Sequence, residues 1–216
     1  MPRTVYFAQN QAAAGTLTGA PVTKRAEFIA AIPSAVSSNG LEANGLGHSV
    51  PITMIWTGSA GNIVGVVKGG ITMTTASEAG GLFNTTVGGN VLLQATLDFY
   101  IDFATPISAF GCYGVDIGDT VPYEDVGSWS VSLRDTQGFE ETLSVPHATP
   151  GSQGNLLFWG FIDTTKSYDR ITLKNSNTAG MQYFGFDDFV VADANQVQPI
   201  YWPASCSAWP GGNAAR

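Results

Sequence analysis

The segment MQYFGFDDFVVAD, residues 181–193, decides how this chain folds, because its aromatic and β-branched residues are typical of a strand. Side chains in a strand alternate between its two faces. Regular alternation therefore places Asp187 and Asp188 on opposite faces. Whichever face packs on a core, one of the two carboxylates points into that core. We expect one face to hold Phe184, Phe186, Asp188 and Val190, and the other to hold Tyr183, Gly185, Asp187, Phe189 and Val191.

The chain contains many short strand-like segments, separated by turn clusters such as SNG, GSAGN and TPGSQGN. Short strands at this spacing indicate a β-sandwich or barrel, and long strands with glycine breaks favour a jelly-roll. We therefore expect an all-β fold, a jelly-roll β-sandwich with one short N-terminal helix and extended terminal arms. The expected strands are 52–56, 62–67, 71–75, 91–103, 107–117, 129–134, 140–145, 155–163, 170–175 and 182–192.

The one helical segment is TKRAEFIAAIP, residues 23–33. Thr23 is the expected N-cap, and Pro33 ends the helix because proline cannot continue it. The domain organisation expected from these patterns is an N-terminal arm over 1–22, the sandwich over 23–192 and a docking tail over 193–216. The tail is rich in Pro and Gly, which excludes long regular elements.

The composition excludes several classes of function. Charged residues make up 12% of the 216 residues, about half the ~25% typical of soluble domains. The net charge is −8, and the nine basic residues are scattered, which argues against nucleic acid and against an anionic membrane surface. Low charge is expected where much of the surface is polar or is covered by other chains. An acidic, oxygen-rich chain is compatible with calcium.

The two cysteines, Cys112 and Cys206, belong to no CxxC or Cys/His cluster. The sequence does not decide whether they form a disulfide, and a buried free thiol is the expectation for Cys112. The N-terminal residues lack the apolar region of a secretory signal, and no run reaches the ~18–20 apolar residues of a membrane span. We therefore expect synthesis in a cytoplasm.

A series of motifs resembles one known family. The segments are TKRAEFIAAIP, NGLEANGLG, DFYIDFATPISAFGCYGVDIGD, WSVSLRDTQGFEETLSV with LLFWGFIDTTKSYDRITLKN, and YFGFDDFVVA. In this order, over residues 23–192, they resemble the β-sandwich domain of PEP-CTERM-type bacterial extracellular proteins. The resemblance implies a jelly-roll related to carbohydrate-binding modules. It also implies a structural calcium held by Glu42 with Asp187 or Asp188, although Leu41 replaces the usual Phe.

The chain departs from this family in two respects, because it shows neither a signal peptide nor a C-terminal sorting segment. A virion is a setting in which a β-sandwich is made without either. For Asp187 and Asp188 themselves, two interpretations stay open. One is calcium binding, and the other is a purely hydrogen-bonded role, since a buried carboxylate needs a partner.

No catalytic arrangement emerges from the residues. His48 and His147 are the only histidines and lack partners at zinc-site spacing. No Ser lies in a G-x-S-x-G elbow, and Glu140 and Glu141 alternate faces of a strand. Trp129 and Trp159 lie in expected strands and are expected in the core. We therefore expect no enzymatic activity.

The sequence predicts a non-enzymatic structural protein, a phage virion component such as a capsid decoration, fibre or tail-associated protein. It would join other subunits, as a homo-oligomer, through its terminal arms, because Trp and Tyr are enriched at interfaces. The alternative is an extracellular carbohydrate-binding or adhesive module with a possible glycan ligand. The expected locations are the virion and, for the alternative, the extracellular space. The expected interface residues are Tyr201, Trp202, Cys206 and Trp209.

Overall fold

Most of the described chain is β-structure, in a computed structural model that describes residues 3–11, 17–42, 50–75, 91–115, 117, 128–146, 155–176 and 184–198. Short turns and alternating apolar residues give the strands, and proline and capping residues delimit the two helices. The elements, in chain order, are β1 (Arg3–Gln11), α1 (Ala20–Ala30), β2 (Ser38–Asn39), β3 (Ile52–Gly58), β4 (Gly61–Thr75), β5 (Val91–Val115), β6 (Trp129–Asp135), β7 (Glu140–Val145), β8 (Asn155–Asp163), β9 (Tyr168–Asn175), β10 (Phe184–Asp193) and α2 (Ala194–Val197).

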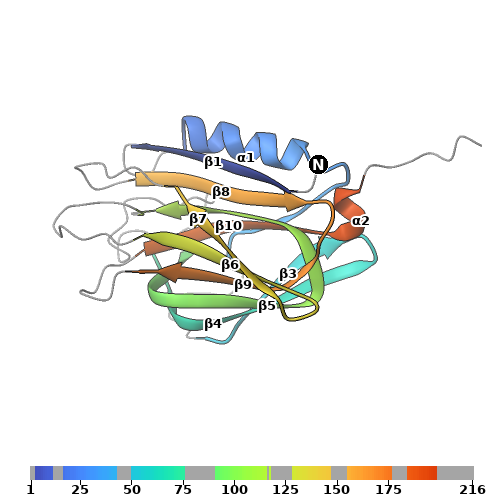
Figure 1. The fold of residues 1–216 in the computed structure, drawn as a ribbon. Coiled ribbons are helices and arrows are strands. Elements are labelled where there is room, and N and C mark those ends of the chain that lie inside the picture. The colour runs from blue at the N-terminus through green and yellow to red at the C-terminus, as the bar shows by residue number, and fades with distance from the viewer. Residues whose placement is uncertain are drawn as a thin grey trace, which may run out of the picture.

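The long strand β5 organises the sandwich, because its two parts belong to different layers (Figure 1). Residues 91–103 pair with β4, and residues 99–102 also pair with β9. Residues 109–115 pair with β8, and β10 pairs with residues 107–115 and also, at Phe184–Phe186, with residues 93–95 of the same strand. One layer therefore contains β3, β4, β9, β6 and β7, and the other contains β1, β8, β10 and β2.

This arrangement confirms the expected all-β sandwich with one short N-terminal helix, to which the structure adds the four-residue helix α2. Two pairs of expected strands are continuous. Residues 62–67 and 71–75 both belong to β4, and residues 91–103 and 107–115 both belong to β5. The glycines and the proline that separated these segments in the sequence bend the strands without ending them.

The main core lies between the two layers and is rich in aromatic side chains. Trp129 is packed edge-on against Phe184 and Phe186, with ring centroids 4.8 and 5.2 Å apart. Trp129 and Trp159 are both buried, as expected. Trp56 is buried as well, and its Nε1 donates a hydrogen bond of 2.7 Å to the carbonyl oxygen of Phe189. This bond fixes β3 to β10 across the core.

A second, smaller core lies under α1, which covers β1 and β8 (Figure 1). Phe28 of α1 is fully buried there, 5.5 Å from the ring of Phe158. The paired glycines Gly111 and Gly160 make this approach possible. A Cβ added to Gly111 would lie 2.8 Å from Phe158 and 3.2 Å from Phe28, so a larger residue would force the helix off the sheet.

The N-terminal part of the chain differs from its expected form. Residues 3–11 of the expected arm form β1, which pairs with β8 along its whole length, from Arg3 opposite Asp163 to Gln11 opposite Asn155. Helix α1 begins at Ala20, before the expected N-cap Thr23, with Gly19 in the N-cap position and proline in the first turn. Proline suits that position because its missing N–H has no helical acceptor there.

Strand β10 does not alternate regularly, so the expected division of its side chains is wrong beyond Asp187. Asp187 lies opposite Tyr113 and Val190 opposite Gly111, which leaves one extra residue on β10. This is a β-bulge, and Asp188 takes up the extra length with a φ of 52°. Because of the bulge, Phe186 and Phe189 both face the main core.

Candidate functional site

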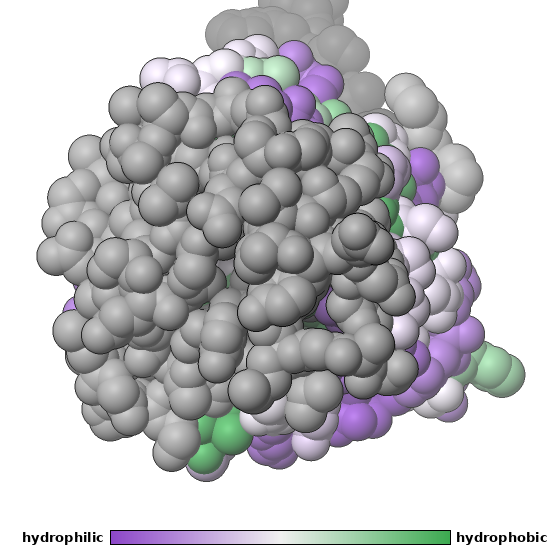
Figure 2. Space-filling view, turned by 90° about the vertical axis from the view of Figure 1, so that its left-hand side faces the viewer, coloured by the Kyte–Doolittle hydropathy of each residue, from purple (hydrophilic) through white to green (hydrophobic). Residues whose placement is uncertain are grey.

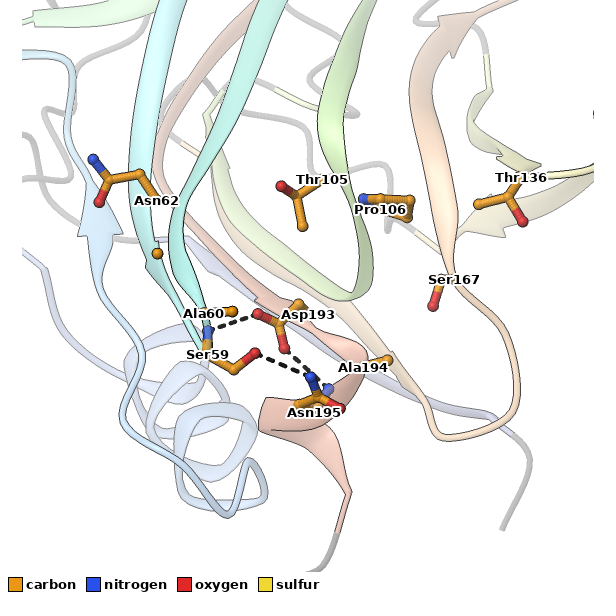
Figure 3. A pocket seen from close by; sticks show the side chains of 11 residues that line it. Ser59, Ala60, Asn62, Thr105, Pro106, Thr136, Ser167, Asp193, Ala194 and Asn195 are labelled. Carbon is orange, nitrogen blue, oxygen red and sulfur yellow. Dashed lines mark hydrogen bonds between the residues drawn. The ribbon is translucent and has the colours of Figure 1, made fainter.

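A pocket of about 440 Å³ lies at the end of the sandwich where several connections meet. Its walls come from the β3–β4 turn at 59–62, the bend of β5 at 105–106, the β6–β7 turn at Thr136, the connection before β9 at Ser167 and the start of α2 at 193–195. We call this part of the molecule the pocket end. Figure 3 shows Ser59, Asp193 and Asn195 grouped together, with Thr105 and Ser167 on other walls.

Asp193 fixes one wall of the pocket. Its Oδ2 accepts a hydrogen bond of 2.7 Å from the backbone N–H of Ser59, and its Oδ1 accepts bonds of 3.0 and 3.1 Å from the N–H groups of Asn195 and Gln196. Burial alone would raise the pKa of this carboxyl, but these bonds outweigh it and hold the pKa below its ordinary value. Asp193 is therefore an ionised N-cap that ties α2 to the β3–β4 turn.

Two further contacts complete this wall. Gln196 Oε1 accepts a bond of 3.0 Å from the N–H of Asp193, which closes a capping box. Gly58 lets the carboxylate approach, since an added Cβ would lie 3.0 Å from Asp193 Oδ2 and 2.8 Å from the carbonyl oxygen of Gly61. The pattern Asp193-x-x-Gln196 was the signal in the sequence that could have placed this helix start.

Hydroxyl groups line the other walls. Ser167 Oγ lies 2.9 Å from Ser108 Oγ, which also contacts the carbonyl oxygen of Lys166 at 2.8 Å. Among the described residues, no hydrogen bond occupies the side chains of Thr105 and Thr136, and both are exposed. The pocket therefore presents polar groups that a ligand can reach. These groups were not predictable from the sequence, because hydroxyl residues in turns are common and carry no distinctive spacing.

The β6–β7 turn, which contributes Thr136 to the pocket, also presents Phe139. The Phe139 side chain is 71% exposed. Asp135 holds the turn: its Oδ1 accepts bonds from the N–H groups of Gln137 and Phe139 at 2.9 and 3.0 Å, and its own N–H donates to the carbonyl oxygen of Phe139 at 2.9 Å. Gly138 has a φ of 88°, a conformation that glycine adopts readily. The aromatic ring is therefore displayed on an ordered turn.

Two of the three expected calcium ligands, Asp187 and Asp188, lie on β10. Asp187 is 1% exposed within β10, its Oδ1 accepts a bond of 2.6 Å from the N–H of Asp188, and Asp188 Oδ1 lies 4.0 Å from Arg25 Nη2. Glu42 is exposed and follows Leu41, which is buried in the main core. Within the described ranges, no three His, Cys, Asp or Glu side chains form a group that could hold a metal. Calcium binding stays a prediction.

Several other sequence-based candidates lie elsewhere. The expected interface residues Tyr201, Trp202, Cys206 and Trp209 are outside the described residues, as are His48 and His147. Cys112 carries a buried free thiol, as expected. Burial, together with the nearby Asp187 carboxylate, raises the pKa of this thiol far above its ordinary value, so it has little thiolate character.

A partly buried polar cluster joins the free edges of the two layers. Asp163 at the end of β8 accepts bonds from Arg3 of β1 and from the Tyr168 hydroxyl of β9, the latter at 2.8 Å. The Tyr168 oxygen also lies 2.9 Å from Glu141 Oε1 of β7, so its single proton is shared between the two carboxylates, and Arg3 forms an ion pair with Glu141. The hydrogen bond from Arg3 is the largest of the influences that lower the pKa of Glu141. Glu141 is therefore an ionised structural residue.

A second charged cluster lies on the outward face of the layer that contains β4, β6 and β9. Asp102 of β5 accepts bonds from Arg170 at 2.6 Å and Lys68 at 3.2 Å, while Arg134 pairs with Asp169 at 2.7 Å. Burial alone would raise the pKa of Asp102, but the bonds from Arg170 and Lys68 outweigh it and lower the pKa. In Figure 2, which faces the end of the molecule on the left of Figure 1, the described residues in view are mainly hydrophilic. Neither cluster lines the pocket.

The described residues contain no helix with the length and apolarity needed to cross a membrane. Comparison with protein-family models and with curated proteins gives no match. Among solved structures, the chain resembles the K2 cleaved adhesin domain of Lys-gingipain (Kgp), with a TM-score of 0.41 and 15% sequence identity over 73% of this chain and 97% of that one. A similarity this distant assigns no function. The resemblance to the PEP-CTERM-type domain stays a prediction.

Proposed function

We propose that this chain is a non-enzymatic adhesive module, which binds a glycan-bearing surface through the pocket end of its sandwich. The observation that carries the proposal is Phe139, which is 71% exposed on a turn that also lines the pocket. Burying a Phe side chain on binding contributes roughly 1.5–3 kcal/mol. Because Asp135 already orders the turn, little conformational entropy is lost when a partner covers the ring.

The chemistry of the neighbouring charged groups supports binding over catalysis. Asp193 is the one carboxylate that the described part of the chain contributes to the pocket lining, and both its oxygens accept hydrogen bonds from the protein. Its pKa is lowered, whereas a general acid working near neutral pH needs a raised one. Glu141 and Asp102 are likewise ionised members of structural clusters.

The test is binding of the purified full chain to a panel of immobilised glycans. We expect at least one glycan to bind, and Phe139→Ser to weaken that binding about tenfold or more. Ile55→Ser is the matched control, because Ile55 is a similarly exposed apolar residue, at 52%, on the strand β3. Absence of binding by the unaltered chain, or equal losses in the two variants, would overturn the proposal.

Assembly into a virion, the function that the sequence predicts first, is the second candidate here. Its expected interface, Tyr201, Trp202, Cys206 and Trp209, lies outside the described residues. The native mass of the full chain, compared with that of a variant lacking 199–216, tests it. A homo-oligomer that dissociates on deletion would favour assembly through the tail, and an unchanged monomer would contradict it.

A further inference from the structure

We propose that the pocket at the pocket end binds a small, neutral, hydroxyl-rich ligand, one or two sugar rings in size. This inference rests on the proposed adhesive function and names the chemical group that the pocket would recognise on the partner surface. The volume, about 440 Å³, lies in the lower part of the roughly 300–1,000 Å³ range of small-molecule sites. A long polymer would therefore present one terminal unit to the pocket.

The charge of the lining selects a neutral ligand. Among the described residues, no Lys, Arg or His belongs to the lining, so an anion finds no cationic side chain there. The single carboxylate, Asp193, is occupied by N–H groups of Ser59, Asn195 and Gln196, which compete with any cation for its oxygens. An anion would therefore lose its hydration without gaining an opposite charge, and a cation would meet a carboxylate whose oxygens already accept hydrogen bonds.

The remaining groups of the pocket lining complement the hydroxyl-bearing edge and the apolar faces of a sugar ring. Thr105 and Thr136 offer hydroxyls with no hydrogen-bond partner among the described residues, and each hydroxyl both donates and accepts, as a sugar hydroxyl does. Ala60, Pro106 and Ala194 supply small apolar surfaces against which the C–H groups of a ring can pack. A lining of this mixed kind fits a ligand that is polar at its edge and apolar on its faces.

The frame of the pocket is already formed without a ligand. Asp193 joins the β3–β4 turn to α2, and Asn195 Nδ2 lies 3.3 Å from Ser59 Oγ (Figure 3). Gln196 Nε2 donates to the carbonyl oxygens of Ala35 at 2.8 Å and Thr57 at 3.2 Å, which anchors the same wall to the body of the sandwich. Binding therefore orders few additional groups, and even a small ligand can be held.

The experiment is a titration of the full chain with free galactose, glucose, mannose, N-acetylglucosamine and their disaccharides, followed by backbone amide NMR. We expect at least one sugar to shift the amides of 59–62, Thr105, Ser167 and 193–195. Thr105→Val and Thr136→Val keep the side-chain shape but remove a hydroxyl, and each is expected to weaken binding about fivefold. Thr53→Val, at an exposed position on β3, is the matched control and leaves affinity unchanged.

Three results would overturn the inference: no sugar shifts these amides, neither pocket variant changes the affinity, or the corresponding uronic acid binds at least tenfold tighter than the neutral sugar. The glycan panel distinguishes failure of the proposed pocket ligand from failure of the proposed adhesive function. Adhesion that depends on Phe139 but not on Thr105 or Thr136 would contradict the pocket ligand and support the adhesive function. Binding of free sugar in the pocket without adhesion would support the pocket ligand and contradict the adhesive function.

Discussion

Arg3 and Asp163 are 160 residues apart in sequence and are joined by hydrogen bonds of 3.2 and 3.1 Å, from Nε and Nη2 of the guanidinium to the same carboxylate oxygen. They also lie opposite each other where β1 pairs with β8. The guanidinium carbon lies 5.6 Å from the centre of the Tyr168 ring. The N-terminal strand is therefore fixed to the sandwich by both its backbone and its first described side chain.

Replacing Arg3 should destabilise the fold. Asp163 is 2% exposed, and Arg3→Met removes the only charged partner that the described residues place against it. Breaking a buried ion pair costs about 3–5 kcal/mol, and the bonds that Asp163 keeps from Thr165 and Lys166 reduce this to about 2–3 kcal/mol. Urea unfolding followed by circular dichroism measures the change in free energy of unfolding.

Lys24→Met is the control for that experiment. Lys24 pairs with Glu27 on the exposed surface of α1, and such pairs contribute about 0–1 kcal/mol. Tyr168→Phe added to Arg3→Met should cost less than the sum of the single changes, because both side chains contact Asp163. Equal effects of Arg3→Met and Lys24→Met would contradict the role assigned to this cluster.

Stability should fall in acid. The folded-state pKa values of Asp102, Glu141, Asp163 and Asp193 lie below the ordinary values of 3.8 for Asp and 4.5 for Glu. A lowered folded pKa means that the unfolded chain binds more protons, so stability rises with pH through this range. The contribution is fully present above about pH 5 and is lost as the pH falls through the folded pKa values. Unfolding free energies measured at successive pH values test this, and stability that is constant down to pH 3 would contradict it.

Cys112 should be inert in the folded protein. Burial and the Asp187 carboxylate both raise the pKa of its thiol, so almost no thiolate is present near neutral pH. In a Cys206→Ser variant, a colourimetric thiol reagent should react only at the rate at which the protein unfolds. Addition of urea above the unfolding midpoint should then release one reactive thiol. Rapid reaction without denaturant would show that the strand pairing around Cys112 opens readily.

Calcium binding is tested by thermal unfolding with calcium and with a chelator. If Glu42 binds calcium with Asp187 or Asp188, calcium at one hundred times Kd adds about 2.7 kcal/mol of stability. Changing both Asp187 and Asp188 to Asn should remove this gain, and Asn at position 188 tolerates the positive φ. Glu27→Gln, on the exposed surface of α1, is the control. An unchanged melting temperature in calcium and chelator would leave Asp187 and Asp188 with a hydrogen-bonded role.

Local pattern was enough to predict most strands. The predicted strand bounds agree with the structure to the residue for β8 (155–163) and for β7 (140–145). Each of these strands is a compact run with β-branched or aromatic residues between turn clusters. The bulge at Asp188 was not predictable in the same way. It depends on the register of β10 against β5, a long-range pairing that alternation within β10 does not reveal.

The site was less predictable than the fold. Asp187 and Asp188 stood out because adjacent carboxylates in an apolar strand are unusual, yet the pocket is built from one to four residues of each of five separate segments. Thr105 and Ser167 are 62 positions apart and approach only because β5 bends between the two layers and β8 returns beside it. Asp193 ends the strand-like segment 181–193, and its capping role depends on Gln196 and Ser59, which that segment does not contain.

The most direct test of the adhesive function is a backbone amide NMR map of the full chain bound to the tightest-binding soluble glycan from the panel. We expect the shifted amides to cluster at the pocket end, at 59–62, Thr105, 135–139 and Ser167. Shifts concentrated on the outward face around Lys68, Asp102 and Arg170, with the pocket end unchanged, would contradict the account.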